Sequence, residues 1–262
     1  MNNSDQRLRV AVHKFSSCDG CQLAFLNLGE DLLTLSQRLN IVFFAEAGMM
    51  DEQSDVDIAF IEGSISTAKD AQRIRNIREH SRTLVTIGAC ATAGGLQALR
   101  NLANARDWVQ AIYTHPEHID TLDTVSPIAE HVKVDFELWG CPINKRQLMT
   151  LINNVALGAF PFAETDKLCM QCKRQQLPCV MVTKGEPCMG PLTRTGCGAL
   201  CPAFGRDCYG CYGPAENINT ESLAQRFSGI GLLPEQISQR FLSIYSHDKN
   251  LADSGLQWKK KS

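Results

Sequence analysis

The chain has 262 residues, 44% of them hydrophobic, and 26 basic side chains nearly balance 28 acidic ones. This length supplies one large core, or a core with a smaller appended module. The balanced charge favours neither nucleic acid nor anionic lipid as a partner, and no apolar run reaches the roughly 18 residues of a membrane span.

The predicted elements of the first 160 residues alternate between strand and helix in chain order. Short apolar runs predict strands, at 8–15, 40–46, 56–65, 83–90 and 134–142. Amphipathic stretches predict helices, at 23–39, 68–81 and 144–158. This alternation is typical of a parallel sheet covered on both faces. We therefore predict an α/β fold with a flavodoxin-like, doubly wound parallel sheet.

The chain begins with polar and then strand-like residues, without a signal-peptide core or a twin-arginine pair. We therefore expect a cytoplasmic protein. Its twelve cysteines are not expected to form disulfides in a reducing cytosol, so they indicate bound metal.

The cysteines divide the chain into two modules. Four are scattered over the first 160 residues: Cys18, Cys21, Cys90 and Cys141. The other eight crowd into 169–211. We predict a first domain over 1–160 and a smaller, irregular, Cys-rich domain over 161–262, whose final WKKKS is expected to be disordered.

The four scattered cysteines lie where ligands bind in such a sheet, beyond the carboxyl ends of the strands. Cys18 and Cys21 follow the first predicted strand, whereas Cys90 and Cys141 end two later ones. We expect the four thiols to converge in space. The alternative, four small apolar core residues inside strands, fits their positions less well.

Four thiolates accept either zinc or an iron-sulfur cluster. The neighbouring Gly20, Gly88 and Gly140 let the backbone come close, and Pro142 fixes the exit from a strand. A cubane is wider than one zinc ion and its sulfides accept backbone N–H bonds, so these loops favour a cluster.

Other polar residues near these motifs have less specific interpretations. Glu62 ends a predicted strand near the four-cysteine site, where it suits a subunit interface, a helix cap or simple solvation. His115 and His118 are expected in a surface loop, because the cysteines already complete the proposed ligand sets.

The Cys-rich stretch is abundant in proline and glycine and lacks regular periodicity, so bound metal must hold it together. Eight thiolates suit two cubanes, with two zinc sites as the alternative. Contiguity suggests two sets, Cys169, Cys172, Cys179 and Cys188, then Cys197, Cys201, Cys208 and Cys211. Interleaved sets remain open, because two-cluster ferredoxins exchange ligands between motifs.

Four motifs together resemble the small subunit of nickel-iron hydrogenases over about residues 9–160. They are S-x-C-D-G-C-Q around Cys18, E-G-S at 62–64, G-A-C-A around Cys90 and W-G-C-P around Cys141. The resemblance implies that Cys18, Cys21, Cys90 and Cys141 bind the proximal 4Fe-4S cluster. The small quinone-reducing subunit of respiratory complex I shares the fold but resembles this chain less, because its first motif has adjacent cysteines and it lacks a second Cys-rich domain.

The same resemblance supports the contiguous sets. Cys169 stands where many relatives have the histidine that opens the distal motif, and Cys208 and Cys211 resemble the end of the medial motif. Cys201 stands where respiratory members have proline and a 3Fe-4S cluster. Three 4Fe-4S clusters are therefore implied, as in the cytosolic, NADP-linked group also called sulfhydrogenases.

The function implied is electron transfer between the H2 site of a nickel-iron large subunit and a flavin/NAD(P)-binding partner, with a ferredoxin-like subunit also expected. No catalytic residue is expected on this chain, because nothing in it resembles the terminal cysteine pairs that bind nickel and iron. No G-x-G-x-x-G follows the first strand to support direct nicotinamide or flavin binding. The alternatives are a structural zinc scaffold, a complex I-like small subunit and a stand-alone ferredoxin-like carrier.

Overall fold

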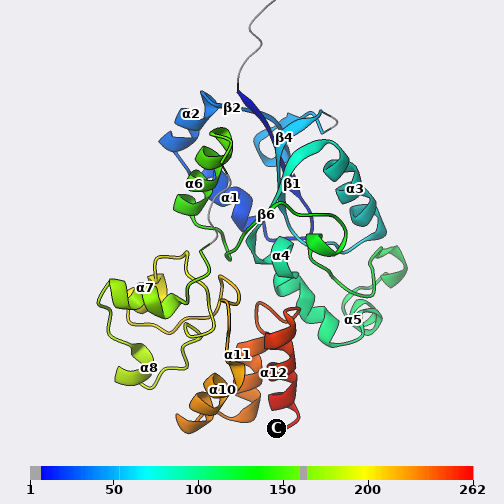
Figure 1. Ribbon diagram of the computed structural model, residues 1–262. Coiled ribbons are helices and arrows are strands. Elements are labelled where there is room, and N and C mark those ends of the chain that lie inside the picture. Colours follow the sequence, from blue (N-terminus) through cyan, green and yellow to red (C-terminus); the bar gives the residue numbers. More distant parts are fainter. Residues whose placement is uncertain (1–6, 53, 160–163, 262) are drawn as a thin grey trace, which may run out of the picture. The chain divides into compact units, whose positions relative to one another are not determined.

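A computed structural model describes residues 7–52, 54–159 and 164–261 of the chain (Figure 1). The chain forms two compact units. The first comprises Met1–Leu138 and Pro142–Pro161, and the second comprises Trp139–Cys141 and Phe162–Ser262. The short Trp139–Cys141 segment thus belongs with the Cys-rich unit, although it lies within the range that the sequence pattern assigned to the first domain.

The first unit is built on a six-stranded sheet in the order β3-β2-β1-β4-β5-β6. The strands are β1 (Leu8–Lys14), β2 (Leu39–Phe44), β3 (Met49–Met50), β4 (Val56–Glu62), β5 (Ser81–Ile87) and β6 (Phe136–Leu138). Only the two-residue β3 pairs antiparallel among these strands. The five parallel strands follow the flavodoxin-like order, which confirms the predicted α/β sheet. The strand order reverses between β1 and β4, so the switch point lies there.

Helices cover both faces of this sheet (Figure 1). One core includes residues of α1 (Gly20–Leu26), α2 (Glu30–Ser36) and α6 (Lys145–Ala156), and the other includes residues of α3 (Ala68–Glu79) and α4 (Gly88–Ala93). On β1, Val10 and Val12 enter the first core and Ala11 enters the second, because successive strand residues point to opposite faces. The buried strands are apolar on both faces for this reason.

Three local expectations are corrected. The predicted helix over 23–39 is two helices, because Gly29 between them has φ +62°, which ends a regular helix. Cys90 lies inside α4 rather than at the end of a strand, since β5 ends at Ile87. Cys141 lies beyond the end of β6 at Leu138.

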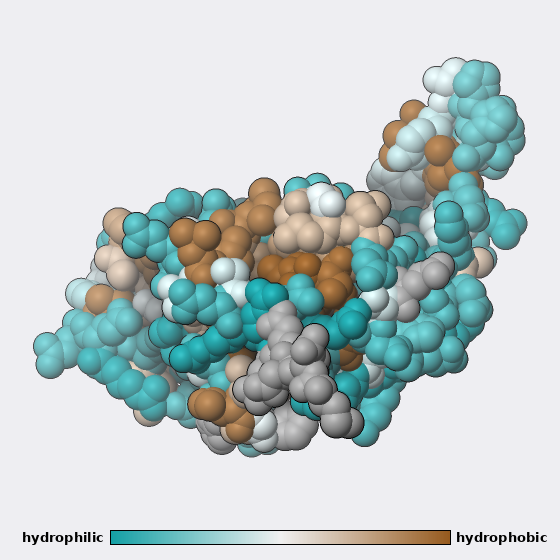
Figure 2. Space-filling model, turned by 90° about the horizontal axis from the view of Figure 1, so that it is seen from above, coloured by the Kyte–Doolittle hydropathy of each residue, from teal (hydrophilic) through white to brown (hydrophobic). Residues whose placement is uncertain are grey.

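The stretch between α4 and β6 contains the short helices η2 (Gly95–Leu102), α5 (Ala105–Ile112), η3 (Pro116–His118) and η4 (Ile128–Glu130), and η1 (Ala45–Ala47) follows β2. None of the helices in the described residues combines the length and hydrophobicity needed to cross a membrane. On the face seen in Figure 2, hydrophobic residues gather in patches that hydrophilic residues surround.

The second unit has an irregular part and a helical part. Only short helices interrupt the Cys-rich stretch, namely α7 (Leu168–Arg174), α8 (Val180–Thr183) and α9 (Leu200–Ala203). Longer helices follow, namely α10 (Thr220–Gly229), α11 (Pro234–Leu242) and α12 (Lys249–Lys259). They pack around buried Phe227, Ile237, Phe241 and Trp258. The expectation of a disordered C-terminal tail is therefore wrong at Trp258, which is 7% exposed.

Candidate metal centres

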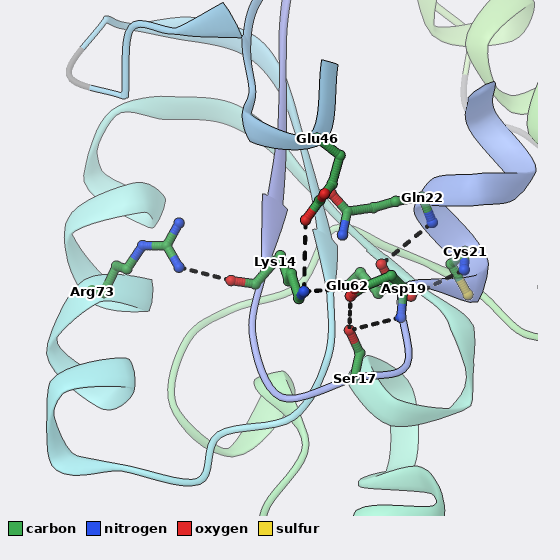
Figure 3. Close-up of polar contacts among 8 residues, drawn as sticks. All are labelled: Lys14, Ser17, Asp19, Cys21, Gln22, Glu46, Glu62 and Arg73. Atoms are coloured by element: carbon green, nitrogen blue, oxygen red, sulfur yellow. Dashed lines mark hydrogen bonds and ion pairs between the residues drawn. The ribbon is translucent and has the colours of Figure 1, made fainter. Parts of the chain in front are cut away.

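The loop that follows β1 is held by polar contacts around Asp19 (Figure 3). Lys14 Nζ lies 2.6 Å from Asp19 Oδ2, and Ser17 Oγ donates to Asp19 Oδ1 at 3.2 Å. The hydrogen bond to Asp19 raises the pKa of Lys14, because it favours the charged ammonium. Asp19 itself takes a left-handed conformation, with φ +66°, directly before α1. The loop thus presents an exposed Cys18 and starts the helix that carries a buried Cys21.

Glu62 holds the start of α1 from across the switch point (Figure 3). Its Oε1 accepts the backbone N–H of Cys21 at 3.0 Å and its Oε2 accepts that of Gln22 at 3.3 Å. Burial raises the pKa of Glu62, and the backbone hydrogen bonds act against that shift. The two hydrogen bonds confirm the helix-capping interpretation of Glu62. Simple solvation is wrong, because the residue is only 2% exposed.

Cys90 lies in the first turn of α4, after β5. Gly95 crosses directly over it, since a Cβ on Gly95 would lie 2.7 Å from Cys90 Sγ. Gly95 also has φ +56°, a conformation that other L residues adopt rarely. Only glycine allows this approach. Gly95 was not among the predicted site residues, although the pair of adjacent glycines after Cys90 is a visible sequence signal.

Gly20 marks another close approach in the first unit. A Cβ at Gly20 would lie 3.4 Å from Cys18 Sγ and 3.6 Å from Pro142 Cβ. Pro142 directly follows Cys141 in the chain. Gly20 therefore lies close both to the Cys18 thiol and to the residue that flanks the fourth predicted ligand, while Cys141 itself belongs to the second unit.

In the second unit, the first set of four cysteines is crowded. Cys169 and Cys172 lie one turn apart on α7. Burial raises the pKa of Cys172 to about 11, and the nearby thiols of Cys169, Cys188 and Cys179 contribute to the shift. A Cβ on Gly190 would lie 3.4 Å from Cys188 Sγ and 3.6 Å from Cys169 Sγ, so backbone without a side chain passes between these thiols. Such crowded thiols suit a bound cation, which stabilises the thiolate form.

The second set is grouped around Cys211. Burial is the largest cause that raises the pKa of Cys211 to about 11, and the charges of Cys141, Cys201 and Cys197 raise it further. Cys197 also contributes to the raised pKa of Cys172, so this thiol borders both sets.

Cys208 borders both sets as well. Its N–H donates to Cys188 Sγ at 3.3 Å, and its own Sγ accepts the N–H of Gly210 at 3.3 Å. Burial raises the pKa of Cys208, and Cys188 and Cys211 contribute to the shift. The two sets of thiols therefore adjoin one another at Cys188 and Cys208.

The donor atoms of the predicted sites are thiols throughout, and four thiolates accept either zinc or an iron-sulfur cluster. Backbone without a side chain lies close to several of these thiols, at Gly95 beside Cys90 and at Gly190 beside Cys188 and Cys169. The backbone N–H groups of Cys208 and Gly210 also donate to cysteine Sγ atoms. A cluster whose sulfides accept backbone N–H bonds would use such close approaches, so the residues present fit an iron-sulfur cluster.

His115, Glu117 and His118 lie at η3 and are all exposed, as expected for a surface loop. Glu117 Oε1 lies 3.1 Å from His115 Nδ1 and 3.8 Å from His118 Nε2. These contacts join three residues of one exposed turn and include no cysteine.

Comparison with known proteins identifies the family. The sequence profile of the family described as "NADH ubiquinone oxidoreductase, 20 Kd subunit" matches residues 18–155. Sulfhydrogenase 2 subunit delta of Pyrococcus furiosus is 30% identical over 239 residues, which cover 91% of this chain and 99% of that protein. The chain belongs to this family as a hydrogenase small subunit.

Two further relatives agree with this assignment. An iron-sulfur subunit of the F420-non-reducing hydrogenase of Archaeoglobus profundus is 24% identical over 300 residues, covering 91% of this small subunit and 92% of that protein. A chain in the crystal structure of an NAD+-reducing [NiFe]-hydrogenase in the H2-reduced state is 28% identical, with a TM-score of 0.56. That match covers 60% of this small subunit and 95% of the other chain.

Proposed function

We propose that this hydrogenase small subunit transfers electrons through three 4Fe-4S clusters, between the H2 site of a nickel-iron large subunit and a flavin/NAD(P)-binding partner. The clusters, when bound, supply one-electron redox chemistry. The protein binds and orients them, and it contributes no catalytic residue. The nickel-iron site is assigned to another polypeptide, because three quartets use all twelve cysteines.

The ligand sets of the proposal follow the motifs. They are proximal Cys18, Cys21, Cys90 and Cys141, distal Cys169, Cys172, Cys179 and Cys188, and medial Cys197, Cys201, Cys208 and Cys211. In the second unit this division is supported by the contributions of Cys169, Cys179 and Cys188 to the raised pKa of Cys172, and by the close approach of Gly190 to the thiols of Cys188 and Cys169.

The observation that carries the proposal is the close approach of backbone to the grouped thiols. The twelve cysteines all lie in the described residues, and none of them forms a disulfide there. Each set also has a close backbone approach that a cluster with sulfide acceptors would use. Gly95 at Cys90 and Gly210 at Cys208 are examples.

The partners in the proposal come from relatives. One matched chain comes from an "NAD+-reducing [NiFe]-hydrogenase", and one relative is named "Sulfhydrogenase 2 subunit delta". We infer a soluble cytoplasmic complex with a large subunit, a flavin subunit and a ferredoxin-like subunit. Its electron acceptor is NAD(P), with sulfur or polysulfide as the alternative acceptor.

The test is anaerobic isolation of the native complex. We expect a brown protein with about 12 iron atoms per small subunit, a nickel-containing partner, and H2-dependent reduction of a dye. Assays with NADP, NAD and polysulfide identify the acceptor. A colourless, zinc-loaded protein contradicts the proposal in favour of a zinc scaffold, and an iron protein without a nickel partner favours a stand-alone ferredoxin-like carrier.

The proximal set has its own test. Cys90→Ser in the native complex should stop H2-dependent reduction of every acceptor, dyes included, because electrons enter the small subunit through that set. Cys90 is on a helix of the stable sheet unit, so the complex should still assemble. Near-normal dye reduction by Cys90→Ser removes the proximal assignment.

A further inference from the structure

Trp139, two residues before Cys141, is packed against two other aromatic or cationic side chains of the second unit. The guanidinium of Arg194 lies over its ring, with Cζ 4.2 Å from the centroid. The ring of Tyr245 stacks on it, with centroids 5.6 Å apart and planes inclined by 30°. A cation over tryptophan and an aromatic stack both stabilise a fixed ring position.

The ring also touches backbone. A Cβ on Gly213 would lie 2.3 Å from Trp139 Cε3, so only glycine leaves room for the indole there. Gly213 has φ +76°, which further disfavours any other residue. The position of the ring therefore depends on the backbone two residues after Cys211.

Each neighbour of the ring is bonded to the same short segment, 211–214. Arg194 Nε donates to the Pro214 carbonyl at 3.0 Å, and the Arg194 backbone N–H donates to the Gly213 carbonyl at 3.0 Å. Tyr245 Oη donates to the Cys211 carbonyl at 2.8 Å. The indole is thus held by a frame whose members are all tied to the segment that begins at Cys211.

The segment that carries Trp139 lies outside regular secondary structure. β6 ends at Leu138, and Gly140 with φ +151° separates Trp139 from Cys141. Through the Trp139 ring and its frame, the segment that carries Cys141 is packed on the segment that begins at Cys211. Cys141 and Cys211 belong to the proximal and medial sets of the proposed function.

We propose that Trp139 is a positioning residue that holds Cys141 at a set separation from Cys211, and thereby sets electron transfer between the two clusters bound there. The proposal rests on the proposed function. It follows physically because tunnelling between redox centres slows steeply as their separation grows, so that a loose ligand segment would slow transfer even with every cluster present.

The experiment compares Trp139→Ala with Trp139→Phe in the complete complex. Exposed Trp108 on α5, which is 52% exposed, supplies the matched control Trp108→Ala. The first readout is amide exchange of the peptide that contains Gly140 and Cys141. The cation–π contact and the stack together correspond to about tenfold in the equilibrium between held and released positions, so Trp139→Ala should exchange about tenfold faster.

The second readout separates positioning from simple stability. Partially reduced complex is examined by electron paramagnetic resonance for the magnetic interaction between proximal and medial clusters, and by rapid mixing with H2 for the reduction rate of the medial cluster. Trp139→Ala should keep its iron, lose much of the magnetic interaction and slow medial reduction. Trp139→Phe should restore most of both, and Trp108→Ala should match the parent.

The outcomes distinguish the two proposals. A parent complex without iron, or without any magnetic interaction between clusters, contradicts the proposed function. A parent with that interaction and a Trp139→Ala variant with unchanged interaction and rate overturns the role of Trp139. If Trp139→Ala does not assemble, Arg194→Gln replaces it by removing the cation over the ring, and an unchanged interaction there likewise overturns the proposal.

Discussion

The sheet unit and the Cys-rich stretch are stabilised by different interactions. The sheet buries Ile58, Phe60, Val85 and Ile87 completely within one core and pairs its strands by parallel ladders. The stretch from Leu168 to Cys211 has helices of only seven, four and four residues, and its buried positions include Cys188 and Cys208. In the Cys-rich stretch thiols occupy buried positions, whereas in the sheet unit aliphatic and aromatic side chains do. The sheet unit can therefore fold by apolar burial, but the Cys-rich stretch depends on what its thiols bind.

The second unit itself shows the same contrast. Helices α10–α12 have their own apolar core, in which Phe227 and Phe241 lie 6.4 Å apart between ring centroids. A Cβ at Gly255 would lie 2.6 Å from Leu242 Cγ, which shows how closely α12 packs on α11. We therefore expect the Cys-rich stretch to need bound metal for its folded structure, and helices α10–α12 of the same unit not to need it.

The largest expected effect is that of removing iron. Chelation under reducing conditions should raise amide exchange in 168–211 to nearly unprotected rates, because binding free energy is folding free energy in small metal-held segments. Exchange in β1, β4 and β5 should change much less, and α10–α12 provide the internal control within the same unit. Hydrogen-exchange mass spectrometry of native and chelated protein measures it. Equal loss of protection in all regions would contradict the contrast between them.

A single ligand change in the Cys-rich stretch should have a more restricted effect. Cys201 lies in the first turn of α9, where proline is tolerated. Cys201→Pro should leave Cys197, Cys208 and Cys211 to bind a 3Fe-4S cluster, whose potential is normally higher than that of a 4Fe-4S cluster in similar surroundings. Dye reduction should survive, whereas reduction of NADP and H2 evolution should fall.

Electron paramagnetic resonance of the air-oxidised Cys201→Pro protein should show a 3Fe-4S signal that the parent lacks. Cys201→Ser, which keeps a possible oxygen ligand, serves as the comparison. Full iron retention with no new signal would mean that Cys201 is not a ligand and that the eight cysteines divide differently.

In the sheet unit, Glu62→Ala tests whether the carboxylate holds the ligand loop. The change leaves the buried N–H groups of Cys21 and Gln22 without their acceptors, which costs about 1–3 kcal/mol. Glu62→Gln keeps one acceptor oxygen and should lose less. The apparent melting temperature and the iron content of the anaerobic protein measure the effect.

Glu46→Ala is the surface control for this change, since Glu46 is half exposed and contacts Lys14 only at 3.6 Å. A melting temperature for Glu62→Ala equal to that of Glu46→Ala would show that Glu62 does not stabilise the loop.

The smallest effect concerns pH and His13 in β1. His13 is 2% exposed and stacks on Phe43 at 4.6 Å between ring centroids. Burial, followed by the charge of Arg73, lowers the pKa of His13 to about 3. Because the unfolded state takes up the proton first, stability is complete above the unfolded pKa of 6.5 and falls as the pH decreases toward 3. Between pH 7.5 and 5.5 the loss from this group is about 1.4 kcal/mol.

His13→Phe should remove that part of the pH dependence while keeping an aromatic ring against Phe43. Melting curves at the two pH values measure the change, and the exposed His118→Ala should retain the parental difference. An identical pH dependence in His13→Phe and parent would show that His13 does not titrate as described.

Much of the fold and the proposed ligand set could be predicted from the sequence, because both depend on local patterns. Apolar runs of strand length alternating with helical periods specify a parallel α/β sheet, and they placed β1, β4, β5 and α3 within a few residues. The crowding of eight cysteines into 169–211 likewise marks a stretch without an apolar core. Chemistry that resides in residue type and spacing is visible before any folding is known.

Contacts between distant segments were decided only by the tertiary structure. Glu62 reaches the N–H of Cys21 across 41 residues because β1 and β4 pair in parallel, with Lys14 beside Glu62. Trp139 on Gly213 depends in the same way on where two distant backbones cross. A linear sequence carries the periodicity of each element, but strand register and side-chain packing arise when elements distant in the chain bury their surfaces together.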